Sequence, residues 1–137
     1  MTDMPATGLA LTFDCEDAHL LATFWAEALG YEPAPPPTGW TTWESWFDDQ
    51  GVPEDERGDG ASIVDPTGVR PRIGFIKVPE PKTAKNRLHL DLQVAGGRHV
   101  PQETRLARIA ANVETLVAAG ATVQQGTPRS TAASTTS

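Results

Sequence analysis

Hydrophobic and polar positions near the start of the chain follow first a strand pattern and then a helix pattern. Residues 9–14 read LALTFD, a short apolar run typical of a strand. Apolar side chains from Leu20 to Leu29 then recur at helical spacing. Asp17 stands at a good N-cap position, and Gly30 stands where a left-handed C-cap residue is wanted. The pattern predicts a strand followed by an amphipathic helix.

A short strand at residues 31–32 is expected to end in a proline-rich segment, because proline removes backbone donors. Thr41 and Glu44 have the spacing of a capping box, which predicts a short inserted helix ending near Gly51. Three aromatic residues lie on one face of that helix: Trp43, Trp46 and Phe47. The acidic, turn-rich residues 52–60 that follow are expected to form a solvated loop or an interaction surface.

The second half of the chain alternates again between strand and helix patterns. Strands are predicted at 61–64 and 72–78, joined by the turn DPTG at 65–68. Residues 88–94, LHLDLQV, alternate apolar with polar positions and predict a half-buried strand. An amphipathic helix follows from Leu106 to Val117, closed by Gly120, and residues 121–123 start a further strand. The order strand, helix, glycine thus occurs twice, which suggests a duplicated unit.

Composition limits the class of protein. With 137 residues the chain is long enough for one core and too short for two independent ones. A net charge of −7 repels phosphate backbones and anionic membranes, so nucleic-acid or membrane binding is not expected. Cys15 is the only cysteine and no secretion signal or bilayer-spanning stretch is seen, so we expect a cytoplasmic protein. Residues 126–137 have almost no apolar side chain and predict a disordered tail.

Four stretches together resemble a known family: FDCEDAHLLATFWAEALGY, VDPTG, VPEPKTAKNRLHLDLQV and VETLVAAGATV. The chain is similar to the glyoxalase-like domains of the vicinal oxygen chelate superfamily, of the sort common in actinobacteria. The resemblance implies an α+β fold of paired βαβββ modules, whose curved mixed sheets enclose a cup for a ligand. The glyoxalase-like domain is expected over 1–125, with a first module at about 8–80 and a partial second module at about 86–125.

Many members of the superfamily hold a divalent metal on the cup floor, through ligands from the first and last strands of each module. Placed on this chain, the resemblance puts those positions at Ala10, near Phe75, at His89, and in closing strands that the sequence lacks. Of these, His89 alone carries a donor, so no metal cofactor is expected, although His89 remains the one candidate ligand. The missing strands leave an unpaired edge, which a partner chain in a homodimer is expected to cover.

The candidate ligand-binding residues are His89, Asp91, Arg87, Phe75, Trp43 and Trp46. His89 could bind metal or act as an acid or base, or could be an ordinary half-buried strand residue. Asp91, two residues on, could orient His89 or pair with an arginine. Arg87 belongs to a basic cluster with Lys82 and Lys85 that could receive an anion or simply balance charge. The aromatic residues suit an apolar pocket, yet such residues more often belong to a core.

These observations favour a small-molecule binding protein without metal chemistry, similar to the bleomycin-resistance members of the superfamily. An enzyme of the lyase, isomerase or dioxygenase type is the alternative, with His89 and a donor from a partner chain holding a metal. A third possibility is a degenerate fragment that keeps the fold and has lost its site. Fold resemblance alone does not decide among them, because function depends on the residues in the cup.

Overall fold

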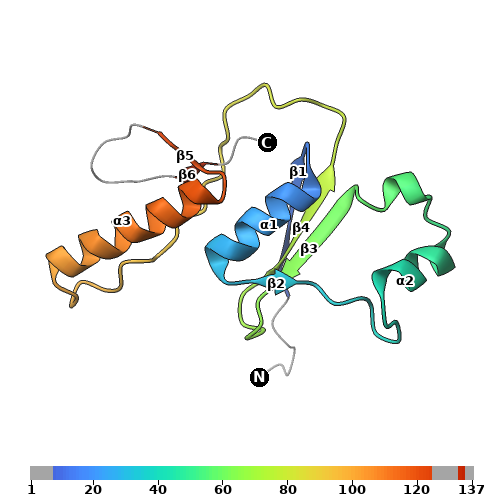
Figure 1. The fold of residues 1–137 in the computed structure, drawn as a ribbon, viewed down its shortest axis with the longest axis horizontal. Coiled ribbons are helices and arrows are strands. Elements are labelled where there is room, and N and C mark those ends of the chain that lie inside the picture. The colour runs from blue at the N-terminus through green and yellow to red at the C-terminus, as the bar shows by residue number, and fades with distance from the viewer. Residues whose placement is uncertain (1–7, 125–132, 135–137) are drawn as a thin grey trace, which may run out of the picture. The chain divides into compact units, whose positions relative to one another are not determined.

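A computed structural model describes residues 8–124 and 133–134 of the chain. Contacts divide the protein into two compact units, residues 1–81 and 82–137, and each is described by itself. Figure 1 shows the first unit as a small sheet with a helix against it, and the second as one long helix with a short strand pair. Within the described residues no helix is long and apolar enough to cross a bilayer.

The first unit is built on a four-stranded mixed sheet. Its elements in chain order are β1 (Ala10–Cys15), α1 (Ala18–Leu29), β2 (Glu32–Pro33), α2 (Trp43–Gln50), the 3-10 helix η1 (Glu54–Glu56), β3 (Gly60–Val64) and β4 (Arg72–Lys77). The strand order is β1-β4-β3-β2, with β1 parallel to β4 and the other pairs antiparallel. The predicted α+β class is therefore confirmed, and the strands and α1 follow in the order β-α-β-β-β, with α2 and η1 inserted between β2 and β3.

Helix α1 begins and ends where its capping residues stand. The Asp17 carboxylate accepts a hydrogen bond from the Leu20 backbone N–H at 3.1 Å, which satisfies one of the free donors of the first turn. Gly30 ends the helix with φ of 72°, a left-handed conformation that a side chain would strain. The small residues Ala18 and Ala22 are buried, so the helix can lie close to the sheet.

The core of the first unit lies between α1 and one face of the sheet. Ile63, Ile73 and Phe75 form its centre from β3 and β4, joined by Cys15, Ala18 and Ala22. Phe75 is 1% exposed and stacks on Phe13 with ring centroids 5.8 Å apart. Because side chains along a strand alternate between faces, the residues between these core positions lie on the opposite face of the sheet.

The β3–β4 connection is a tight turn at the predicted position, and Asp65 organises it. One carboxylate oxygen accepts hydrogen bonds from the Thr67 N–H and hydroxyl at 2.9 and 2.8 Å. The other accepts from the Arg70 backbone N–H and Nε at 2.9 and 3.0 Å. The Arg70 guanidinium also lies over the Tyr31 ring at 4.7 Å, and the Tyr31 hydroxyl donates to the Pro71 carbonyl at 2.8 Å. The turn is thereby tied to the end of α1.

Helix α2 forms where a short inserted helix was predicted, but its cap is one residue later than expected. Thr42, not Thr41, is the N-cap: its hydroxyl accepts from the Ser45 N–H at 3.1 Å and lies 2.7 Å from the Ser45 hydroxyl. The predicted capping box between Thr41 and Glu44 is therefore wrong, since Glu44 points to an arginine instead. Gly51 ends the helix as predicted, with φ of 68°.

The second unit contains α3 (Gln102–Ala118), β5 (Thr122–Val123) and β6 (Ala133–Ser134). Helix α3 starts four residues before the predicted helix, directly after Pro101, which suits a helix start because its missing N–H is not needed there. Strands β5 and β6 pair antiparallel. The disorder predicted for residues 126–137 stays a prediction, and of this segment the structure describes residues 133–134, which form β6. The rest of that segment lies outside the described residues.

Residues 88–94 do not form the predicted strand. They have no regular secondary structure, but the exposure of their side chains still alternates along the segment. Leu90, Leu92 and Val94 are half-buried, while Asp91 and Gln93 are exposed. A strand requires a hydrogen-bonded neighbour, and in residues 8–124 and 133–134 no segment pairs with this one. The strand prediction is therefore wrong for this single chain, for want of a partner strand.

Candidate ligand-binding hollow

A hollow of about 960 Å³ lies within the first unit, in the size range of small-molecule sites. Its walls come from α1, from α2, from the loop after η1 and from the sheet. The helical and loop part of the lining comprises His19, Ala22, Thr23, Ala26, Trp43, Glu44, Phe47, Glu56, Arg57 and Gly58. The sheet part includes Ala10, Thr12, Gly60, Ser62, Arg72 and Gly74. The lining thus mixes apolar, aromatic, hydroxyl and charged groups.

The register of the sheet explains why the sheet part of the lining is polar and small. Thr12 pairs with Gly74, and Gly74 pairs with Ser62, so these three residues form one row across β1, β4 and β3. They alternate with the core residues Ile73 and Phe75 and therefore lie on the face opposite α1. We call this face, carrying Thr12, Gly74, Ser62 and Arg72, the open face. The lining of the hollow also includes residues of the core face, among them Ile63 and Phe75.

Trp43 connects α2 to the sheet beside this row. Its indole Nε1 donates to the Ala34 carbonyl at 3.0 Å, and the Ala34 N–H donates to the Ser62 carbonyl at 2.9 Å. Trp46 packs edge-on against Trp43 at 5.6 Å, and Phe47 lies 5.8 Å from Trp43. An aromatic wall therefore stands at the Ser62 end of the open-face row.

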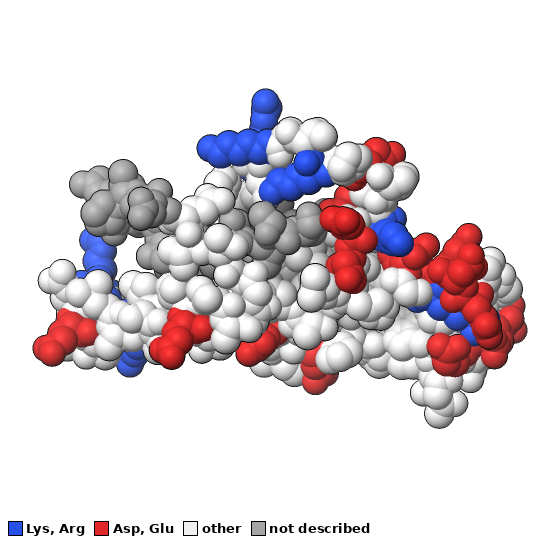
Figure 2. Space-filling view, turned by 45° about the horizontal axis from the view of Figure 1, so that its top comes forward, with Lys and Arg blue, Asp and Glu red and all other residues white. Residues whose placement is uncertain are grey.

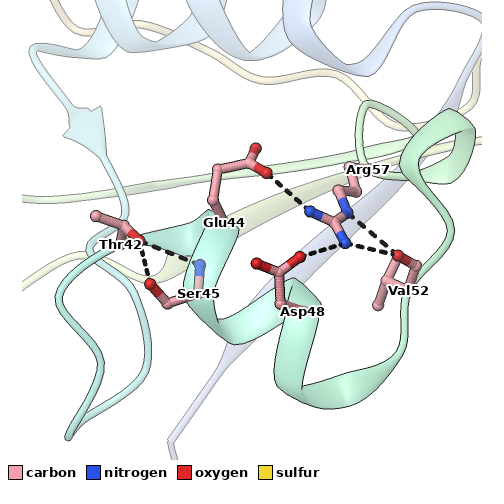
Figure 3. A network of polar contacts seen from close by, with 6 residues as sticks. All are labelled: Thr42, Glu44, Ser45, Asp48, Val52 and Arg57. Carbon is pink, nitrogen blue, oxygen red and sulfur yellow. Dashed lines mark hydrogen bonds and ion pairs between the residues drawn. The ribbon is translucent and has the colours of Figure 1, made fainter.

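Arg57 fastens α2 to the loop that follows it, as Figure 3 shows. Its Nη1 donates to Glu44 at 2.8 Å and its Nη2 to Asp48 at 2.8 Å, both on α2. Its Nε and Nη2 donate to the Val52 carbonyl at 3.1 and 3.0 Å. The guanidinium also lies 5.6 Å from the Phe47 ring centre. Since α2 has no buried residue, this polar clamp holds the aromatic wall in place.

The charges around the clamp are strongly acidic. Hydrogen bonds from the guanidinium to Asp48 raise the pKa of Arg57 above its ordinary value, burial acts in the opposite direction, and the bond to Glu44 raises it again. Figure 2 shows acidic side chains gathered at the end of the first unit that carries α2 and η1. Glu54, Asp55 and Glu56 of η1 contribute to this surface. The clamp therefore neutralises part of a negative region beside the hollow.

The structure brings together two of the six predicted ligand-binding residues. Phe75 and Trp43 line the hollow, although the Phe75 side chain is almost wholly taken up by the core. Trp46 is not in the lining and instead supports Trp43 from behind. The remaining three, Arg87, His89 and Asp91, are exposed and belong to the second unit.

The residues at the family's metal positions do not fit a metal site. Ala10 has no donor, and Phe75 lies on the core face, opposite the hydroxyls of the open face. The β4 residues that share the open face, Arg72, Gly74 and Ile76, carry no anionic or imidazole donor either. In the part of the chain that the structure describes, no three His, Cys, Asp or Glu side chains gather closely enough to hold an ion.

Cys15 is a structural thiol. It is 4% exposed, and its Sγ lies 3.5 Å from the Ile76 carbonyl, to which it can donate. Burial raises the pKa of the thiol, and the charges of Asp17 and Asp14 raise it further. Since the thiolate is the nucleophile, these effects disfavour a reaction of Cys15.

Several residues of the hollow were not singled out from the sequence: Thr12, His19, Arg57, Ser62 and Arg72. The alternation of β1, β3 and β4 could have shown that Thr12, Ser62 and Arg72 share the polar face of a strand. No sequence signal linked Arg57 to Glu44, because their contact depends on how the loop after α2 folds back.

Comparison with known proteins gives one match. A family model described as a glyoxalase-like domain matches residues 10–136 of the chain. No curated protein and no solved structure matches. The matched range covers the first unit from the start of β1 and nearly all of the second.

Proposed function

Because the chain belongs to the glyoxalase-like domain family of the vicinal oxygen chelate superfamily, we propose that it binds a small organic molecule in the hollow of its first unit. The observation that carries the proposal is the aromatic wall of Trp43 and Phe47, held over a hollow of about 960 Å³ by the Arg57 clamp. Aromatic walls with a few convergent polar groups are typical of small-molecule sites. The lack of metal-binding side chains at Ala10, at Phe75 and on the open face of β4 argues for binding without a metal.

Glycine amide signals provide a direct test of this proposal. Gly58, Gly60 and Gly74 line the hollow, whereas Gly30 and Gly68 do not. We expect neutral one- and two-ring aromatic fragments, added to the labelled full-length chain, to shift the first three amide signals in NMR spectra and to leave the other two in place. Equal shifts at all five glycines, or no shift with any fragment, would contradict binding in the hollow.

A matched pair of tryptophan variants tests which ring of the aromatic wall contacts the ligand. Trp43 lines the hollow and Trp46 lies behind it, on the same helix. We expect Trp43→Ala to weaken the binding of fragments about tenfold or more, since burying an aromatic ring against a ligand contributes a kcal/mol or more. Trp46→Phe keeps a ring against Trp43 and should change affinity little. Loss of affinity in Trp46→Phe alone would reverse the two roles.

We also propose that Arg87, His89 and Asp91 take part in binding the ligand. The same titration with Arg87→Gln, His89→Ala and Asp91→Asn tests them one at a time. A metal-dependent reaction is the alternative function, and elemental analysis of the full-length chain checks it. Stoichiometric metal that disappears in His89→Ala would favour the enzyme over the binding protein.

We further propose that the paired-module arrangement is completed in a homodimer. Strand β1 ends the sheet, and among residues 8–124 and 133–134 no strand covers its outer side. Residues 88–94 keep the alternation of a strand without a strand partner. Pairing of this segment with the free edge of β1 in a second copy of the chain would give a partner to both the edge and the segment. A reducing, cytoplasmic setting suits the single buried thiol.

A further inference from the structure

We infer that the open face of the sheet binds a carboxylate group of the ligand, so that the ligand is an aromatic carboxylate. The inference rests on the proposed function and deepens it. It depends on three groups of the open face: the hydroxyls of Thr12 and Ser62 and the guanidinium of Arg72. All three residues line the hollow.

The two hydroxyls flank an empty place over Gly74. A Cβ built on Gly74 would lie 3.7 Å from the Thr12 Oγ1 and 3.7 Å from the Ser62 Oγ. Both oxygens therefore stand above the glycine, one from each neighbouring strand. Within the described residues, neither hydroxyl forms a hydrogen bond to another protein group. Two unused donors across a glycine form a cradle for an acceptor atom.

Arg72 gives this cradle its charge preference. It precedes Gly74 by two residues on β4, so both residues lie on the open face, about 7 Å apart along the strand. An extended arginine side chain spans such a distance. The ion pairs of the described residues involve Arg57 and Arg70, and leave Arg72 without a carboxylate partner. A guanidinium with free donors favours a carboxylate, which it can bind through two parallel hydrogen bonds.

The acidic groups nearby do not occupy Arg72. Asp14 lies on the same face two residues beyond Thr12, and Glu32 pairs with Val64 of β3, so the strand β3 lies between Glu32 and β4. Glu44, which lines the hollow, is already paired with Arg57. A protein of net charge −7 repels a free anion at long range, so the local cation and hydroxyls must provide the attraction.

The aromatic part of the ligand follows from the position of Trp43. The hydrogen bonds from Trp43 to Ala34 and from Ala34 to Ser62 bring the indole to the Ser62 end of the row. A ligand with its carboxylate over Gly74 can therefore lay a ring toward Trp43. A single-ring arylacetate has this layout of one anionic and one aromatic group.

The experiment compares two probes of equal shape, para-fluorophenylacetate and para-fluorophenylacetamide, by fluorine NMR titration of the full-length chain at neutral pH. The acetate is expected to bind about tenfold more tightly than the neutral amide, as a charge-assisted hydrogen bond predicts. In Arg72→Gln this ratio should fall to near one, with the affinity for the amide unchanged. Lys77→Gln removes the same charge from the core face of the same strand and should preserve the ratio.

A second pair of variants tests the cradle without changing charge. Gly74→Ala places a methyl group between the hydroxyls at ordinary contact distances, so the fold is kept while the space is filled. We expect it to weaken binding of the acetate severalfold more than binding of the amide. Gly8→Ala, outside the lining of the hollow and with open space where a Cβ would stand, is the control and should affect neither.

The outcomes separate this inference from the proposed function. Equal binding of acetate and amide to the unchanged protein, or a ratio that survives Arg72→Gln, would overturn the carboxylate site and leave small-molecule binding intact. If neutral fragments shift the amide signals of the glycines that line the hollow while the acetate does not bind, the carboxylate site is likewise overturned and small-molecule binding is kept. Failure of both probes and of all neutral fragments would overturn the proposed function as well.

Discussion

At the scale of single residues, Asp65 makes the stability of the first unit depend on pH. The side chain is 1% exposed, and hydrogen bonds from Arg70 and Thr67 hold the pKa of its carboxyl well below the usual range. A group whose pKa is lower in the folded state stabilises the protein at a pH above its unfolded pKa, about 3.9. That contribution is lost as the pH falls through the unfolded value toward the folded one.

The corresponding variant is Asp65→Asn, which removes the charge and keeps the shape. We expect a clearly lower midpoint of thermal unfolding at pH 7, and a smaller loss of stability between neutral and acid pH than in the unchanged protein. Thermal unfolding followed by circular dichroism over a series of pH values measures both. Asp55→Asn, at an exposed position of η1, is the control. An unchanged pH dependence in Asp65→Asn would show that another group is responsible.

Single residues also show where sequence reasoning was sufficient and where it failed. The roles of Asp17, Gly30 and Asp65 follow from local chemistry, because each acts on backbone groups within a few residues. The role of Arg57 does not, since its acceptors lie up to 13 residues away and depend on the path of a loop. Local rules therefore predicted the caps and the turn, but not the clamp beside the hollow.

At the scale of elements, the glycine that ends α1 gives a test of the helix boundary. Gly30 has φ of 72° and open space where a Cβ would stand, so Gly30→Ala would strain the backbone without a clash. We expect a loss of about 1 kcal/mol in the free energy of unfolding. Gly8→Ala, also in open space and without a positive φ, is the control. Denaturant unfolding measures both, and equal effects would contradict a conformational cause.

Elements were predicted well where their pattern is local and poorly where they need a distant neighbour. Helix α1 and strands β1, β3 and β4 lie close to their predicted ranges. Residues 88–94 have the clearest alternation in the sequence and still form no strand, because alternation sets which side chains are buried but does not supply a ladder of hydrogen bonds. The lining of the hollow could not be predicted for the same reason, because its residues come from elements that are separate in the sequence.

At the scale of the whole molecule, the free edge of β1 and the unpaired residues 88–94 lead to a prediction about assembly. We expect sedimentation to give twice the chain mass of 14.7 kDa. Leu90→Pro should shift the protein toward the monomer, because proline cannot donate to a strand ladder. Lys85→Pro, in the preceding exposed segment, should leave the mass unchanged. A monomer at every concentration would contradict dimerisation through this edge.

The parallel pairing of β1 with β4 also affects the order in which the sheet can form during folding. Ala10 lies opposite Arg72, so the pair of the edge strand β1 with β4 joins residues 62 positions apart along the chain. Local elements such as α1 form within about a microsecond, whereas contacts between distant segments must first overcome the entropy of closing a long loop. During synthesis, β1 leaves the ribosome first and has no strand beside it until β4 is made. The earliest segment of the sheet is therefore the one that waits longest for its neighbour.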